Sequence, residues 1–159
     1  MGLLRQDTDS QAGDNLAPAP GLQDLPDLVD ACAAAGLAVT VTVDGEAGRL
    51  TPVLDLTAYR IVQEALTNVS KHAAGPTAQV HLTYTPRHLT LSITNDTGPS
   101  RPAPSAALHG GFGLISMRER VTAVGGSFHA GHRPHGGFEV ACTLPLENRE
   151  VSPDESPAP

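Results

Sequence analysis

One segment of the chain carries four polar side chains with the chemistry of a metal–phosphate site. Glu64, Asn68, Lys71 and His72 are spaced so that a helix would place them on one face, in successive turns. An amide oxygen is a hard ligand for Mg²⁺, a lysine neutralises phosphate oxygens, and a carboxylate can polarise a water or hydroxyl. Apolar residues recur between them at helical spacing, which predicts one long helix over 54–73. The same pattern also suits an amphipathic helix whose polar face is merely solvated.

Three glycine-containing segments follow this helix. Each one alone would only mark a turn. Glycine also lets a backbone approach phosphate closely, and a helix that starts directly after it offers free N–H groups to an anion. The first segment ends a strand-like run, the second opens a helix-like run and the third opens a final strand-like run; they are Asn95-Asp96-Thr97-Gly98, Gly110-Gly111-Phe112-Gly113-Leu114 and Gly136-Gly137-Phe138.

In this order, the helix and the glycine segments resemble the nucleotide-binding boxes of the ATPase superfamily that includes histidine kinases, gyrase and MutL. The pattern is most similar to the catalytic ATP-binding domain of two-component sensor histidine kinases. The stretches QEALTNVSKHA and GFGLISMRERV resemble the subfamily that pairs with LuxR- or NarL-type response regulators. The resemblance covers 22–146 and implies the cofactors ATP and Mg²⁺.

The order of elements predicts an α/β (α+β) two-layer sandwich, in which helices and strands are grouped rather than strictly alternating. We expect a mixed, mainly antiparallel sheet of about five strands, covered on one face by about three helices, and the resemblance implies the same Bergerat fold. Asp55 or Thr57 should lie near the start of the long helix. The other helices are expected over 22–35 and 112–124, and the strands over 37–43, 79–84, 89–94, 127–130 and 137–144. Outside the domain at 22–146, we expect a linker or the remnant of a dimerisation helix over 1–21 and a disordered acidic tail over 147–159.

The resemblance gives the polar residues of the long helix specific roles. Asn68 matches the asparagine that holds Mg²⁺ against the nucleotide phosphates. Lys71 and His72 match a lysine–histidine pair near the phosphates, although His72 would also suit a helix C-terminus, where it complements the dipole. Glu64 matches a glutamate that orients water in hydrolysing relatives, and in a kinase it would tune the surroundings of the nucleophile or the metal.

The first glycine segment departs from the family pattern. The family has an aspartate there, which accepts a hydrogen bond from the adenine amino group. The alternation of apolar residues over 89–93 makes Asn95 the next inward-facing position, whereas matching by motif letters selects Asp96. One step along a strand turns the side chain to the other face, so both cannot be right. We favour Asn95 as the base-facing residue, with Gly98 giving the backbone room. A hydrogen bond from the adenine amino group to a neutral amide contributes about 1 kcal/mol, whereas one to a charged acceptor contributes roughly 1.5–3 kcal/mol.

The other two glycine segments are expected to shape the phosphate end. The resemblance implies that the backbone of Gly111-Phe112-Gly113-Leu114 approaches the phosphates, and that 99–110 forms the ATP lid. Gly136 and Gly137 would support the sheet where it passes close to the lid helix.

Composition excludes several classes of function. The chain has 159 residues and a formal net charge of −7, which argues against a nucleic-acid surface because such surfaces need clustered Lys and Arg. The sequence has no apolar run long enough to span a bilayer, so we expect no membrane contact by this domain. Cys32 and Cys142 lack metal-ligand spacing and fit reduced thiols. These features predict a cytoplasmic domain, whose parent kinase could still be membrane-anchored.

The phosphoacceptor is expected elsewhere. A histidine kinase phosphorylates a histidine on a dimerisation helix, usually beside an acidic residue, and none of the seven histidines has that context. The implied partner is therefore the dimerisation and histidine-phosphotransfer domain of the parent kinase, with a response regulator as an indirect partner. Alone, the chain should bind ATP and not autophosphorylate.

Two other functions remain open from the sequence. The first is a serine/threonine kinase of the anti-sigma-factor type, which has the same fold and needs no dimerisation helix. The second is a degenerate, non-catalytic module that binds nucleotide or protein, which the altered first glycine segment keeps in view.

Overall fold

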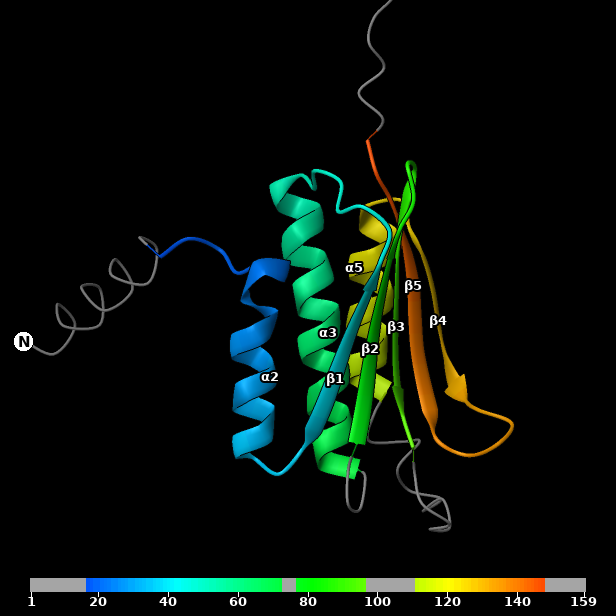
Figure 1. Cartoon of the computed structure of the whole chain (residues 1–159). Helices are drawn as coiled ribbons and strands as arrows, with labels where there is room; N and C mark the ends of the chain where they lie inside the picture. The colour runs from blue at the N-terminus through cyan, green and yellow to red at the C-terminus, as the bar shows by residue number, and fades with distance from the viewer. Residues whose placement is uncertain (1–16, 73–76, 97–110, 148–159) are drawn as a thin grey trace, which may run out of the picture.

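A mixed sheet of five strands forms one layer of the molecule (Figure 1). The computed structural model describes residues 17–72, 77–96 and 111–147. The strand order is β1-β2-β3-β5-β4; β1 pairs parallel with β2, and all other pairs are antiparallel. The expected mixed, mainly antiparallel sheet is thus confirmed. The strands are β1 Ala38–Asp44, β2 Thr77–Tyr84, β3 His88–Asn95, β4 Ser127–His132 and β5 Phe138–Pro145.

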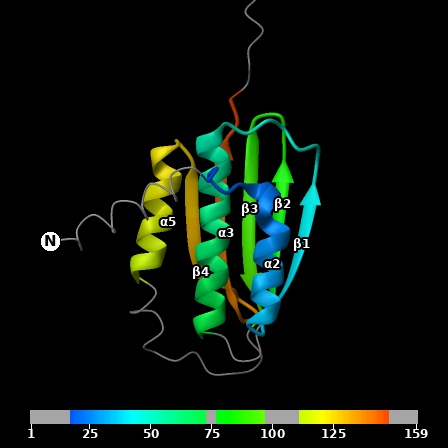
Figure 2. The ribbon, with the colours of Figure 1, turned by 90° about the vertical axis from the view of Figure 1, so that its left-hand side faces the viewer.

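Helices form the second layer and cover one face of this sheet (Figures 1 and 2). The expected helix over 22–35 is divided into a short 3₁₀ turn and an α-helix, whose second residue is a proline. Proline is tolerated at that position because the first N–H groups of a helix have no intrahelical partner. The elements are η1 Leu22–Asp24, α2 Leu25–Ala34, α3 Pro52–His72 and α5 Gly111–Ala123.

The core lies between the two layers and is aliphatic. Along β3, Leu89, Leu91 and Ile93 are buried, whereas the residues between them are partly exposed. This alternation follows from the two-residue period of a strand, which sends successive side chains to opposite faces. The helices meet the buried side of the sheet with residues such as Leu66 of α3 and Met117 of α5. The other side of the sheet carries mostly polar side chains and is not covered by any helix among the described residues.

The long helix begins two residues before its expected start at 54. Thr51 caps it, because its Oγ1 accepts a hydrogen bond from the Leu54 N–H at 3.3 Å. Asp55 accepts instead from the Leu22 N–H at 2.8 Å, and so ties η1 to the first turn of α3. Thr57 donates its hydroxyl to a backbone carbonyl one turn back. Asp55 and Thr57 were thus expected correctly in the first turns, but neither is the cap.

No helix in the described part of the chain combines the length and the apolar character needed to cross a membrane.

Candidate functional site

Four of the segments singled out from the sequence meet at one end of the sandwich. The last turns of α3, the end of β3, the first turn of α5 and the start of β5 all lie at the lower end in Figures 1 and 2. α3 and α5 also pack against each other. The fold therefore gathers residues that are distant in sequence.

Glu64 and Asn68 of α3 lie directly against Gly113 of α5. A Cβ atom placed on Gly113 would be 2.7 Å from Glu64 Oε1 and 3.3 Å from Asn68 Nδ2. Both polar side chains are half-buried. The absence of a side chain at Gly113 thus lets the backbone of α5 approach a carboxylate and an amide closely. The structure brings three of the predicted site residues into one cluster.

This cluster has the donor set of a magnesium site that is completed by its substrate. A carboxylate and an amide supply hard oxygen ligands one helical turn apart, and the start of a 13-residue helix supplies free N–H groups. Mg²⁺ usually takes only one or two protein ligands together with phosphates and waters. Among the described residues, no three His, Cys, Asp or Glu side chains gather as a complete metal cage. The residues present therefore fit Mg²⁺ that arrives with a phosphate ligand.

The neighbouring predicted residues are placed only in part. Lys71 lies one turn beyond Asn68, and its side chain is exposed. His72 ends α3, and Gly111 and Phe112 begin α5, so their backbones lie at the same end of the fold. Leu114 packs against the hydrophobic core, which leaves its backbone as the part that can approach a ligand. Gly98 and the expected lid at 99–110 lie outside the described residues.

Asn95 and Asp96 point to different surroundings. Asn95 is 6% exposed and continues the buried row of β3, so it faces the helix layer. Its Oδ1 accepts a hydrogen bond from the Phe138 N–H of β5 at 2.9 Å. Asp96 is exposed, and its Oδ1 accepts from Arg133 Nη1 at 3.2 Å. The strand register therefore makes Asn95 the interior residue, as the alternation over 89–93 predicts.

Gly137 allows the first and the last glycine segments to meet. A Cβ atom on Gly137 would lie 2.0 Å from the backbone oxygen of Asn95, and the residue adopts a φ of +87°. Both features require glycine. The backbone of Gly137 thus approaches the end of β3, and the expected support of the sheet near the lid helix stays a prediction. Sequence reasoning missed this contact, and the bond to the Phe138 N–H, because pairing between distant strands leaves no local signal.

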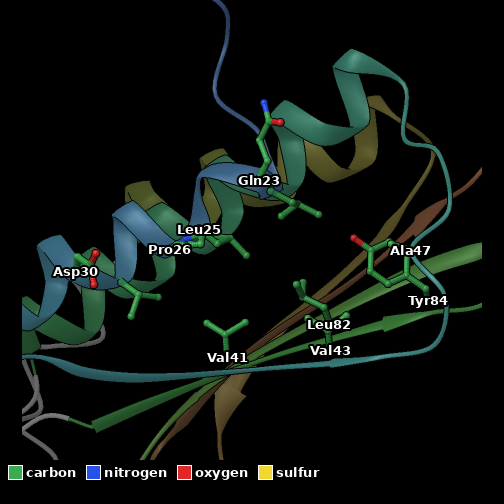
Figure 3. A pocket seen from close by; sticks show the side chains of 11 residues that line it. Gln23, Leu25, Pro26, Asp30, Val41, Val43, Ala47, Leu82 and Tyr84 are labelled. Atoms are coloured by element: carbon green, nitrogen blue, oxygen red, sulfur yellow. The ribbon is translucent and has the colours of Figure 1, made fainter.

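Two hollows of the described surface lie away from Glu64 and Asn68. The larger, of ≈ 590 Å³, opens between α2 and the edge of the sheet and is lined mainly by apolar side chains such as Leu25, Val41 and Leu82 (Figure 3). The smaller, of ≈ 240 Å³, lies between α2 and α3 and reaches Lys71. Neither is lined by Glu64 or Asn68.

A family model described as "Histidine kinase-, DNA gyrase B-, and HSP90-like ATPase" matches residues 54–148. The chain belongs to this family. The family resemblance drawn from the motifs is thus confirmed, whereas the pairing with LuxR- or NarL-type regulators stays a prediction.

Two relatives of this chain are named as sensor histidine kinases, and a third is named as a sensor protein. Sensor histidine kinase LnrJ of Bacillus subtilis is 32% identical over 123 residues, which are 77% of this chain and 30% of that protein. Sensor histidine kinase YxjM of the same organism is 37% identical over 98 residues, covering 60% of this chain and 22% of that protein. Sensor protein VraS of Staphylococcus aureus is 34% identical over 97 residues, which are 61% of this chain and 27% of that protein. The chain thus spans less than a third of the length of these relatives.

The fold also matches a solved structure. The blue-light activated histidine kinase of Erythrobacter litoralis EL346 superposes with a TM-score of 0.61, covering 80% of this chain and 45% of that chain, at 19% sequence identity. At this identity the likeness concerns the fold alone, and it confirms the expected sandwich of a five-stranded sheet and a helical layer.

Proposed function

We propose that the chain is the ATP-binding catalytic domain of a sensor histidine kinase. In this function it presents the γ-phosphate of ATP to a histidine on a dimerisation domain of the parent kinase, and a response regulator receives the phosphoryl group afterwards. The observation that carries the proposal is the contact of Glu64 and Asn68 with Gly113, because it places hard oxygen ligands beside a helix N-terminus.

Asn68 is the residue that would hold Mg²⁺, through its side-chain oxygen. The ion, when bound, neutralises charge on the phosphates during phosphoryl transfer. Glu64 shares the contact with Gly113, so its carboxylate would orient the Asn68 amide or a water beside the ion. Lys71, exposed one turn further along α3, would neutralise phosphate oxygens, and His72 would lie beside it.

The base would bind at the end of β3. Asn95 is held there on the helix side of the sheet, while Asp96 lies on the surface and pairs with Arg133. We assign the contact with the purine to Asn95 and a supporting role to Gly137, whose backbone approaches Asn95 closely. Gly98 would give the backbone room beside the base. The domain would act in the cytoplasm, without a membrane contact of its own.

Calorimetric titration with ATP, with and without Mg²⁺, tests the proposal. We expect Mg²⁺-dependent binding with a dissociation constant in the micromolar to sub-millimolar range. Asn68→Ala should weaken this affinity by at least about tenfold, which corresponds to ~1.4 kcal/mol. Ser70→Ala is the matched control, because Ser70 is exposed on the same helix two residues away. It should bind as the wild type does.

Thermal melting of each variant without ligand separates a lost ligand contact from a lost fold. Absence of ATP binding by the folded wild-type domain at millimolar ATP would refute the catalytic function and leave a degenerate binding module on an inherited fold.

A further inference from the structure

The amide of Asn95 has a defined orientation. Its Oδ1 accepts a hydrogen bond from the Phe138 N–H, and a backbone N–H can only donate. The side-chain oxygen, not the nitrogen, must therefore face β5. Because the oxygen and nitrogen diverge from one carbon, the Nδ2 group is directed away from the Phe138 N–H.

The surrounding structure holds this orientation in place. Asn95 is 6% exposed, and it pairs with Phe138 in the ladder between β3 and β5. The backbone of Gly137 lies against the Asn95 carbonyl, so the end of β3 and the start of β5 approach each other closely. Turning the amide over would set the Nδ2 group against the Phe138 N–H, so two donors would meet and a hydrogen bond would be lost. The side chain thus offers a donor at Nδ2 and a second lone pair at Oδ1.

We propose that the base subsite accepts 6-oxopurine nucleotides, the inosine and guanosine type, as well as adenine nucleotides. The inference rests on the proposed function, which puts the purine beside Asn95. An ionised carboxylate that faces position 6 could only accept there, so it would favour the amino group of adenine and repel an oxo group. The Asn95 amide can donate from Nδ2 to a 6-oxo group, or accept a 6-amino hydrogen at the second lone pair of Oδ1.

Asp96 does not supply the missing carboxylate. It lies one step along the chain, is exposed, and binds Arg133. One step along extended backbone turns a side chain to the other face. A purine held beside Asn95 would therefore be read by a neutral amide.

The test compares three nucleotides on three proteins. Wild type, Asn95→Asp and the control Asp96→Asn are titrated with MgATP, MgITP and MgCTP by calorimetry. Inosine differs from adenosine in the purine edge that includes position 6, and cytidine reports binding through the phosphates and ribose alone. The shift of the melting temperature by each nucleotide gives a second readout, because a ligand stabilises the fold that it binds.

Asn95→Asp should fold, since a carboxylate oxygen can still accept from the Phe138 N–H, and melting without ligand checks this. We expect wild type to bind ITP within about tenfold of ATP, and both at least tenfold more tightly than CTP. Asn95→Asp should widen the ATP-to-ITP ratio by at least about tenfold, because a carboxylate facing an oxo group leaves both without a donor. Asp96→Asn should leave the ratio unchanged.

Three results would overturn the inference. The first is a wild-type protein that binds ATP but binds ITP more than about thirtyfold more weakly, because Asn95 would then discriminate as a carboxylate would. Equal binding of CTP and ATP would show that Asn95 reads no base. An unchanged ratio in a folded Asn95→Asp would place the base elsewhere. Failure of wild type to bind any of the three nucleotides would instead refute the proposed function, so the two ideas fail separately.

Discussion

Replacing Gly113 by alanine should weaken ATP binding without unfolding the domain. The added Cβ would lie 2.7 Å from Glu64 Oε1 and 3.3 Å from Asn68 Nδ2. The carboxylate oxygen must therefore move by roughly half an ångström, which is feasible because it is the far end of a flexible side chain. Alanine in a helix is favoured over glycine by up to ~1 kcal/mol, so the free energy of unfolding should change by no more than about 1 kcal/mol.

The ATP affinity should behave differently from the stability. Displacement of Glu64 and narrowing of the space beside Asn68 act where the phosphates are proposed to bind, and small misplacements of positioning groups are costly there. We expect a loss of about tenfold in ATP affinity, or ~1.4 kcal/mol, by calorimetry, beside an unchanged or slightly raised melting temperature. Thr122→Ala, at an exposed position of α5, is the control and should change neither.

A double-mutant cycle identifies the cause. In a Glu64→Ala background the nearest atom to the new Cβ is gone, so Gly113→Ala should cost markedly less ATP affinity there than in wild type. Wild-type ATP affinity in a folded Gly113→Ala protein would refute the assignment of this cluster to the phosphates. A fall in stability of several kcal/mol would refute the reasoning that the carboxylate can move aside.

Two further predictions concern the fold. Gly137→Ala should lower the free energy of unfolding, measured in urea, by about 2–4 kcal/mol, because its Cβ would meet the Asn95 backbone oxygen at 2.0 Å and its φ is +87°. Gly36→Ala is the control, since Gly36 has a φ of +90° and a Cβ there would meet nothing within 4 Å; it should cost only about 1 kcal/mol. Equal losses of stability in the two variants would contradict this account. Burial raises the pKa of the Cys142 thiol from 9.0 to about 12, so the native state retains a proton that the unfolded state releases, and stability falls as the pH rises through that window. The free energy of unfolding of wild type should fall by up to ~1.4 kcal/mol per pH unit relative to that of Cys142→Ala. The same dependence of the unfolding free energy on pH in both proteins, measured in urea, would contradict this prediction.

The sequence predicted the elements well where their periodicity is complete. The apolar residues at alternate positions over 89–93 identified β3 and, through its register, placed Asn95 on the buried face, as its 6% exposure confirms. The apolar stripe likewise identified most of α3; it consists of Ile61, Val62, Ala65, Leu66 and Val69. These signals are local, because each reflects which side of one element faces the core.

Other features depend on contacts between distant segments and could not be read from the sequence. Thr51 caps α3 two residues before the expected start of the helix, and Asp55 binds the Leu22 N–H of a distant segment instead. The parallel pairing of β1 with β2 and the bond of Asn95 to Phe138 arise only after the sheet has assembled. Gly113 was expected to face phosphate, but its contact with Glu64 and Asn68 required the packing of α5 on α3.

The most direct test of the account is phosphoryl transfer in trans. The chain is incubated with ATP labelled at the γ-phosphate and Mg²⁺, with and without a separately purified dimerisation domain of the parent kinase. We predict label on a histidine of the dimerisation domain, recognised because the phosphoramidate is labile to acid and stable to base, and no label on the chain alone. Label on serine or threonine would contradict the assignment as a histidine kinase domain. So would a chain that binds ATP but transfers no phosphoryl group to a folded dimerisation domain.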